Sequence, residues 1–208
     1  MSDKPLVVAV PKGRILKPLS KLLGALGIEA SALLADDRTL VRRAGGLEFL
    51  LLKPDDVPTY VEYGAADLGI CGRDVLRERE CDVLVPLDLR IGRCRTVVAA
   101  PVARTARSGV PRVATKYPRT AAAHFAAKGV QAEIIYVQGS VELAPLVGLA
   151  EMIVDLVETG ETLVQNGLEI IEVVAEVSTV LVANRASYKL LAADVAPLIE
   201  RLRAAIGP

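Results

Sequence analysis

The sequence contains very few aromatic residues. Its 208 residues include no tryptophan, two phenylalanines and five tyrosines, so aromatic side chains make up 3% of the chain. Apolar residues nevertheless account for 52%, so alanine, valine and leucine must fill the interior. This composition favours many tightly packed layers of strands and helices over a core built on aromatic anchors. A chain of this length forms one large domain or two small ones.

The chain also lacks net charge, because its 25 basic residues are balanced by 25 acidic ones. This balance argues against binding to nucleic acids or membranes through bulk charge, so any basic function must be local. The apolar run near the N-terminus, Leu6–Val10, is too short for a signal peptide or a membrane span.

Cysteine and histidine are scarce as well, with three and one residues. Cys71, Cys81 and Cys94 show no CxxC spacing, which argues against a zinc site or a disulfide and favours reduced thiols in the cytoplasm. The single histidine, His124, lies in an alanine-rich helical stretch, and we expect it to be structural because no orienting partner is evident beside it.

What the sequence does contain is a regular alternation of short apolar runs with stretches of helical spacing. The pattern predicts strands at 6–10, 67–71, 83–87, 95–100, 112–116, 133–137 and 152–157, with a hairpin at 39–52 turning at Gly45 and Gly46. Asp55 or Asp56 is expected to cap the helix that follows the hairpin, which runs to Tyr63. A closing amphipathic helix lies within Ser187–Ile206, and its main part is expected to start at Asp194, because Pro197 suits a first turn. Strands alternating with helices predict parallel α/β sheets.

We expect two such sheets. The segment Ala103–Pro111, rich in small residues, is expected to cross between them, and the long β-rich segment Leu168–Asn184 to run back. The predicted division is a first lobe of residues 1–100 and 178–208 and a second lobe of residues 101–177.

The stretch Ile153–Gly167, IVDLVETGETLVQNG, carries the clearest chemistry. An apolar strand with Asp155 near its end is followed by Thr159, Gly160 and Thr162 where a helix begins. A helix N-terminus binds phosphate well, and glycine allows close approach of the backbone. The pattern suits a sugar phosphate, with Asp155 on ribose hydroxyls and the loop on the phosphate. The alternative is that Thr159 is an ordinary helix cap. Glu161 would repel phosphate, so we expect its side chain to point outward.

This local pattern resembles the phosphoribosyl-diphosphate loop of the common phosphoribosyltransferases, although those carry two adjacent acids where this chain has Asp155 followed by Leu156. The longer segment Glu142–Leu163 resembles the signature of the ATP phosphoribosyltransferase family. The resemblance continues, in order, through PKGR at 11–14, DVPTYVE at 56–62, GAADLGI at 64–70, GRDVL at 72–76 and RVATKY at 112–117. It therefore spans nearly the whole chain.

The resemblance implies a fold and a reaction. The fold is α/β and two-lobed, of the periplasmic-binding-protein-like (type II) kind, with an active-site cleft between the lobes. In the reaction, adenine N1 of ATP attacks C1′ of phosphoribosyl diphosphate, and diphosphate leaves with Mg²⁺. The product is N1-(5-phosphoribosyl)-ATP, the first intermediate of histidine biosynthesis. No dedicated metal ligands are expected, because Mg²⁺ would be bound mainly through the substrate diphosphate.

Positioned cations would stabilise the charge that builds on the departing diphosphate. The resemblance implies this catalytic role for Lys12 and Arg14, and more loosely for Arg38. The alternatives are a solvated loop for Lys12 and Arg14, and a surface ion pair with Asp36 or Asp37 for Arg38.

The resemblance also implies roles for two further groups of residues. ATP would be held by a group at another strand-to-helix junction: Asp67, Gly69, Gly72, Arg73 and Asp74. Asp74 and Gly72 could equally serve as a helix cap and a turn. Phosphoribosyl diphosphate would be held by Asp155, Thr159, Gly160, Glu161 and Thr162, together with Gly139, Ser140 and Glu142. Glu142 could instead simply occupy a first helical turn.

Gly207 and Pro208 follow the closing helix directly, so the chain resembles the short form of the family. That form implies a homodimer of catalytic chains within a hetero-oligomer, together with a regulatory subunit similar to histidyl-tRNA synthetase. The competing interpretation is a non-catalytic solute-binding module, because the same architecture serves such proteins and fold does not fix function.

Overall fold

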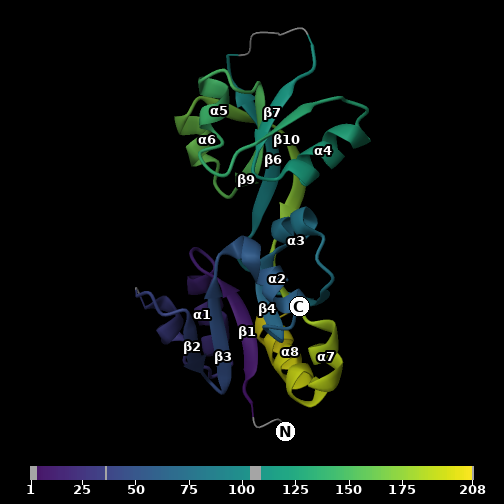
Figure 1. The fold of residues 1–208 in the computed structure, drawn as a ribbon. Helices are drawn as coiled ribbons and strands as arrows, with labels where there is room; N and C mark the ends of the chain where they lie inside the picture. The colour runs from purple at the N-terminus through teal and green to yellow at the C-terminus, as the bar shows by residue number, and fades with distance from the viewer. Residues whose placement is uncertain (1–3, 36, 104–108, 208) are drawn as a thin grey trace. The chain divides into compact units, whose positions relative to one another are not determined.

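The computed structural model describes residues 4–35, 37–103 and 109–207 (Figure 1). The chain divides into two compact units, Met1–Gly92 with Ser178–Pro208, and Arg93–Val177. The first unit is therefore assembled from both ends of the chain, whereas the second is continuous. Within the described ranges, no helix is long and apolar enough to cross a membrane.

The first unit contains a six-stranded sheet in the order β2-β3-β1-β4-β11-β5. Its strands are β1 (Leu6–Pro11), β2 (Val41–Ala44), β3 (Leu47–Leu52), β4 (Leu68–Gly72), β5 (Leu84–Asp88) and β11 (Thr179–Ala183). Its helices are α1 (Leu16–Ala25), η1 (Ser31–Leu34), η2 (Pro54–Asp56), α2 (Val57–Glu62), α3 (Arg73–Arg79), α7 (Arg185–Leu190) and α8 (Ala192–Ile206).

The expectation of parallel sheets holds only in part, because both sheets are mixed. In the first unit β1 pairs in parallel with β3 and β4, but β2 and β11 run antiparallel to their neighbours. The antiparallel β2–β3 pair is the hairpin predicted from Gly45 and Gly46, where both glycines adopt a positive φ. β11 enters from the far end of the sequence, and neither hydrophobic periodicity nor turn signals indicate its direction.

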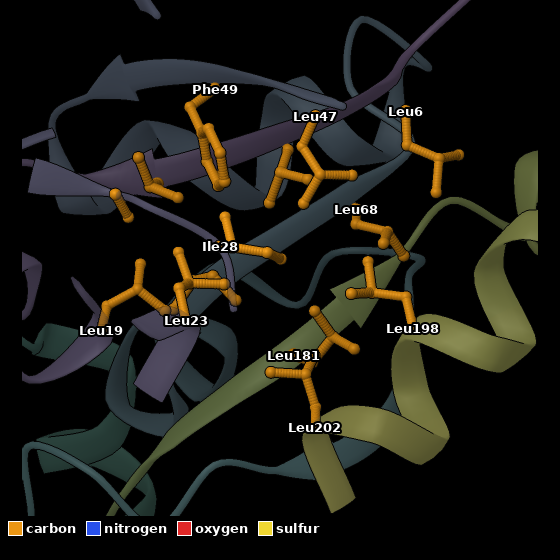
Figure 2. Close-up of a cluster of buried hydrophobic side chains, with 14 of the residues drawn as sticks. Leu6, Leu19, Leu23, Ile28, Leu47, Phe49, Leu68, Leu181, Leu198 and Leu202 are labelled. Atoms are coloured by element: carbon orange, nitrogen blue, oxygen red, sulfur yellow. The ribbon is translucent and has the colours of Figure 1, made fainter. Parts of the chain in front are cut away.

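One face of this sheet is covered by α1 and α8. Buried residues of α8 recur as Val195, Leu198, Ile199 and Leu202, the i, i+3, i+4, i+7 spacing of an amphipathic helix. In Figure 2, Leu198 and Leu202 of α8 lie beside Leu68 of β4 and Leu181 of β11. The opposite face packs on α2 through Val57 and Val61. The core thus consists mainly of aliphatic side chains, as the composition predicts.

The second unit contains a five-stranded sheet in the order β10-β6-β9-β7-β8. Its strands are β6 (Cys94–Pro101), β7 (Arg112–Thr115), β8 (Glu133–Tyr136), β9 (Met152–Val157) and β10 (Leu168–Val177). Its helices are α4 (Pro118–Ala127), α5 (Leu143–Leu146) and α6 (Glu161–Gln165). β7 is parallel to β8 and β9, whereas β6 is antiparallel to β9 and β10.

The crossing points differ in part from those expected. The chain leaves the first unit after Gly92 rather than after Ala100, because β6 pairs with β9 and β10 in the second sheet. The segment Ala103–Pro111, expected to cross between units, lies within the second unit, and residues 104–108 fall outside the described ranges. The return falls at Val177–Ser178, between β10 and β11.

Two expectations about helix starts are met only in part. Asp56 occupies the N-cap position of α2, but its side chain makes no capping hydrogen bond. The closing helix α8 begins at Ala192, so Pro197 lies inside it rather than in its first turn.

Candidate functional site

Within the first unit, loops bearing the predicted functional residues meet at one edge of the sheet. The parallel pairs Pro11–Leu52 and Ala9–Gly69 bring the carboxyl ends of β1, β3 and β4 to that edge. β11 starts there, with Thr179 opposite Gly72. Ligands of open α/β sheets bind beyond the carboxyl ends of strands, so this edge is where binding residues are expected.

Lys12 and Arg14 belong to the loop that follows β1. The backbone amide of Lys12 donates to the Leu52 carbonyl at 2.8 Å. Gly13 between them has φ +98°, a conformation that residues with a side chain rarely adopt. The side chains of Lys12 and Arg14 are exposed. The loop thus presents two cationic residues at the carboxyl end of the central parallel strand.

Arg38 lies at the same edge, three residues before β2 begins, and it is exposed. Asp37, one of its two possible partners, instead accepts from the Thr39 amide and pairs with Arg42. Asp36, the other possible partner, lies outside the described residues.

Gly72, Arg73 and Asp74 form the junction between β4 and α3. Gly72 is the N-cap residue, with an extended backbone and no side-chain cap. A Cβ at Gly72 would lie 2.0 Å from the Asp74 Oδ1 atom, so glycine leaves the space that the buried Asp74 carboxylate occupies. Asp74 lies in the first turn of α3 and is not its cap residue. The Arg73 amide donates to the Ser178 carbonyl at 3.0 Å.

Asp67 and Gly69 do not lie with this junction, contrary to the sequence prediction. Asp67 precedes β4, about 16 Å from Gly72 at roughly 3.3 Å per strand residue. Its carboxylate accepts from the Val7 amide at 2.9 Å and from the Ser187 hydroxyl at 2.7 Å. Gly69 is buried in mid-strand, where a Cβ would lie 2.6 Å from Val61 Cγ2. Asp67 therefore links elements of the first unit, and Gly69 permits close helix–sheet packing.

Within the second unit, the carboxyl ends of β7, β8 and β9 likewise meet at one edge. Thr115 of β7 pairs with Val154 of β9 and with Tyr136 of β8. The buried Thr115 hydroxyl donates to the Val154 carbonyl at 2.6 Å and accepts from the Tyr117 amide at 2.8 Å. These bonds fix the ends of β7 and β9 side by side and place Lys116 and Asp155 one residue further along each strand.

Asp155 is a partly buried carboxylate near the end of β9. Burial is the main reason that its pKa rises to about 6, and the nearby Glu142 charge adds to the rise. The Leu156 amide, which donates to Oδ1 at 2.8 Å, and the Lys116 charge oppose it. A carboxyl group with a pKa this far from its ordinary value marks a functional-site candidate.

The loop after β9 has the backbone conformation that the sequence pattern indicates, but a different cap residue. Gly160, not Thr159, is the N-cap of α6, and its φ is +88°. The Thr159 hydroxyl accepts from the Glu161 amide at 3.4 Å. Glu161 and Thr162 are exposed at the first two positions of α6. The helix ends as predicted, with Gly167 at φ +68° just after it.

Gly139, Ser140 and Glu142 occupy the connection between β8 and α5. Gly139 and Ser140 are exposed, and Ser140 has φ +49°, which is uncommon for a residue with a side chain. Glu142 is the N-cap residue of α5 without a side-chain cap bond, and its charge acts on Asp155. It therefore faces the same edge of the second sheet as Asp155.

Sequence reasoning missed three residues at these two edges. Lys116 lies within the RVATKY resemblance, and its place at the end of the predicted strand 112–116 could have marked it. Asp88 ends β5, and its carboxylate accepts from the Ser178 hydroxyl at 2.6 Å. No sequence signal points to Asp88 and Ser178, because the two residues are 90 positions apart.

His124, expected to be structural, contacts Glu172 of β10 at 3.2 Å.

The arrangement of two α/β units joined by two chain crossings defines a class of fold. It matches the periplasmic aliphatic sulphonate binding protein SsuA from Escherichia coli with a TM-score of 0.62 at 13% identity, over 99% of this chain and 73% of that one. At this identity the likeness concerns the fold alone, which is the two-lobed periplasmic-binding-protein-like (type II) fold.

The chain belongs to the ATP phosphoribosyltransferase family, whose model matches residues 53–204. It is 63% identical to an ATP phosphoribosyltransferase from Sorangium cellulosum, over 97% of this chain and 96% of that relative. It is 51% identical to an ATP phosphoribosyltransferase from Geobacter metallireducens, over 97% of this chain and 98% of that relative. Among solved structures, it matches the ATP phosphoribosyl transferase (HisG:HisZ) complex from Thermotoga maritima with a TM-score of 0.83 at 35% identity. The match covers 97% of this chain and 98% of that chain. The family consists of pentosyltransferases, so the expectation of an enzyme is confirmed.

Proposed function

We propose that this chain transfers the 5-phosphoribosyl group of phosphoribosyl diphosphate to N1 of the adenine ring of ATP. The C1′–oxygen bond to diphosphate breaks and a C1′–N1 bond forms, giving N1-(5-phosphoribosyl)-ATP and diphosphate, the first step of histidine biosynthesis. The observation that carries this proposal is the family match across residues 53–204, together with the near full-length relatives.

The phosphoribosyl group is assigned to the second unit. Asp155 accepts hydrogen bonds from the ribose hydroxyls, with Glu142 beside it. Thr159, Gly160 and Thr162 bind the 5′-phosphate, since the left-handed turn at Gly160 and the first amides of α6 suit an anion. Gly139 and Ser140 line the neighbouring connection. Glu161 belongs to this loop through its backbone, and its exposed carboxylate stays away from the phosphate.

The departing diphosphate is assigned to Lys12, Arg14 and Arg38 of the first unit. Bond breaking leaves positive charge on the ribose ring and adds negative charge to the diphosphate, so fixed cations at the diphosphate lower the barrier. Arginine pairs with phosphate oxygens in a bidentate manner. Adenine N1 is a neutral nucleophile with a lone pair, so the step needs no general base.

ATP is assigned to Gly72, Arg73 and Asp74 at the junction of β4 and α3. We do not assign Asp67 and Gly69 to this site. The Asp67 carboxylate accepts hydrogen bonds from Val7 and Ser187, and Gly69 packs closely against Val61.

Mg²⁺ fits this scheme as an ion that arrives with the substrate. Mg²⁺ commonly binds through one or two carboxylates plus substrate phosphates rather than in an all-protein cage. Among the residues that the structure describes, no group of three or more potential ligand side chains could hold a metal ion. When bound, Mg²⁺ would neutralise charge on the diphosphate, and Asp155 and Glu142 are the carboxylates in the second unit that could assist.

The T. maritima relative was solved as a HisG:HisZ complex, which supports a hetero-oligomer. We assign to this chain a homodimer that works with a histidyl-tRNA-synthetase-like regulatory subunit. Since the reaction consumes ATP, we place it in the cytoplasm.

The test is direct. The purified full-length chain, with and without the regulatory subunit, is mixed with ATP, phosphoribosyl diphosphate and Mg²⁺, and phosphoribosyl-ATP is quantified by chromatography. Product in either mixture supports the proposal. Ligand binding without product in both mixtures would favour the solute-binding alternative.

A further inference from the structure

The carboxylate of Asp88, the last residue of β5, contacts three separate segments of the first unit. Its Oδ2 atom accepts from the Ser178 hydroxyl at 2.6 Å and from Nε and Nη2 of Arg73, both at 3.4 Å. Its Oδ1 atom accepts from the Arg90 backbone amide at 2.8 Å. A single side chain thus joins the start of α3, the chain after β5 and the residue before β11.

Two of these segments are where the chain leaves and re-enters the first unit, at Gly92 and Ser178. They are bonded to each other, because Thr179 donates to the Ile91 carbonyl at 3.1 Å. The departing segment is also closely fitted. Gly92 has φ +58°, and a Cβ there would lie 2.3 Å from Ile15 Cδ1. The surroundings of Asp88 are therefore defined by backbone as well as by side chains.

The three contacts of Asp88 differ in strength. The bonds from Ser178 and the Arg90 amide are short, whereas the 3.4 Å contacts to Arg73 exceed the 2.7–2.9 Å typical of charge-assisted pairs. The two short bonds fix the position of the Asp88 carboxylate, and the two longer contacts direct the Arg73 guanidinium toward it. A guanidinium has five N–H donors, and two point at Asp88, so others can reach an anion.

The charge on Asp88 persists at neutral pH. Burial by itself would raise the pKa of this carboxyl, but the Ser178 hydroxyl, the Arg90 amide and the Arg73 charge together lower it below its ordinary value. Asp88 therefore remains an anion that can aim a guanidinium.

We propose that Asp88, held by Ser178, is a positioning residue for ATP that acts through Arg73. The inference rests on the ATP-binding role proposed above for Arg73. Asp88 sets the direction of the Arg73 guanidinium, while the Ser178 carbonyl holds the Arg73 amide at 3.0 Å. Ser178 thus contacts both members of the pair, and ATP affinity depends on the residue at which the chain returns to the first unit.

The test compares Michaelis constants for the two substrates in variants of the full-length chain. Asp88→Asn removes the charge and should raise KM for ATP about tenfold, the equivalent of one charged hydrogen bond. KM for phosphoribosyl diphosphate should change less than about twofold, since the change is local to Arg73. Ser178→Ala should also raise KM for ATP, with a smaller effect. Ser178→Thr, which keeps the hydroxyl, should have the same KM for ATP as the wild type.

Asp82→Asn is the matched control. Asp82 pairs with Arg185 at 2.6 Å on the exposed surface of the same unit, so its loss should leave both Michaelis constants unchanged. Equal rises in KM for both substrates in Asp88→Asn would indicate a merely structural role and overturn the inference.

A double-mutant cycle separates this inference from the proposed ATP site. With Arg73→Ala already present, Asp88→Asn should raise KM for ATP no further, because the two residues act as one unit. Additive effects would overturn the positioning role while leaving Arg73 in the ATP site. If Arg73→Ala itself leaves KM for ATP unchanged, the ATP role of Arg73 fails and the inference fails with it.

Discussion

Replacing Asp155 by asparagine should make the protein more stable and less able to bind its substrate. Asparagine keeps the shape of the side chain and an oxygen that can accept from the Leu156 amide at Oδ1, but it removes the charge. The folded chain holds this carboxyl in a partly buried place that raises its pKa from 3.8 to about 6. A buried charge is tolerated here because, in the proposed site, it binds the ribose.

The magnitude follows from the pKa. A shift of roughly 2 units corresponds to about 3 kcal/mol, at about 1.4 kcal/mol per unit, and solvent reaching the carboxyl makes this an upper bound. Since the pKa is raised in the folded state, ionisation of Asp155 costs stability. The cost is absent below the ordinary pKa, grows as pH rises from 3.8 to about 6, and is complete above that range. For a chain of this size, 3 kcal/mol corresponds to a rise in Tm on the order of 6–12 °C.

Urea unfolding followed by far-ultraviolet circular dichroism measures this effect, because the chain contains no tryptophan for fluorescence. At pH 8 the midpoint of Asp155→Asn should lie above that of the wild type, and at pH 4 the two midpoints should nearly coincide. Glu176→Gln, an exposed site in the same unit, is the control and should shift neither midpoint. Calorimetry should show weaker binding of phosphoribosyl diphosphate by Asp155→Asn. A variant no more stable than wild type at pH 8, or equally stabilised at pH 4, would refute the reasoning.

Three further outcomes are expected. Arg14→Ala should lower kcat far more than it weakens ATP binding, because its charge acts on the departing diphosphate, and steady-state kinetics would count against this if both fell equally. Replacing Thr159 and Thr162 by valine should weaken binding of phosphoribosyl diphosphate about tenfold in calorimetry with little change for ATP, and unchanged affinity would remove the loop from the phosphate site. Gly69→Ala should destabilise the fold by about 1–3 kcal/mol in urea unfolding, because its Cβ would lie 2.6 Å from Val61 Cγ2; Gly24→Ala, which meets nothing within 4 Å in α1, should instead stabilise slightly.

The sequence predicts individual elements well where local chemistry decides them. The strand Met152–Val157 and the glycine that ends α6 agree with the structure, because apolar runs and left-handed glycines leave a local signature. Whether a strand pairs in parallel, and in which sheet, is decided by distant partners. Cys94–Pro101 therefore looks like a continuation of the first unit although it pairs in the second.

The candidate site shows the same division. Thr159, Gly160 and Thr162 stand out because three adjacent residues carry the pattern. Asp67 and Gly72 look like one cluster in the sequence but lie at opposite ends of β4. Five residues of an extended strand span about 16 Å, which separates the two side chains. No sequence pattern marks Asp88, because its role depends on contacts with Ser178 and Arg73, which are distant in the sequence.

The position of β11 between β4 and β5 determines the order in which a growing chain can be completed. After Asp88 has been synthesised, the ribosome must add all of the second unit before it reaches Ala183, which takes roughly 5–20 s at about 5–20 residues per second. During that time β4 and β5 have no strand to join them, while the second unit, continuous in sequence, is completed at Val177, before β11 is made. The second unit is thus complete first, and the first unit closes only when the last part of the chain arrives.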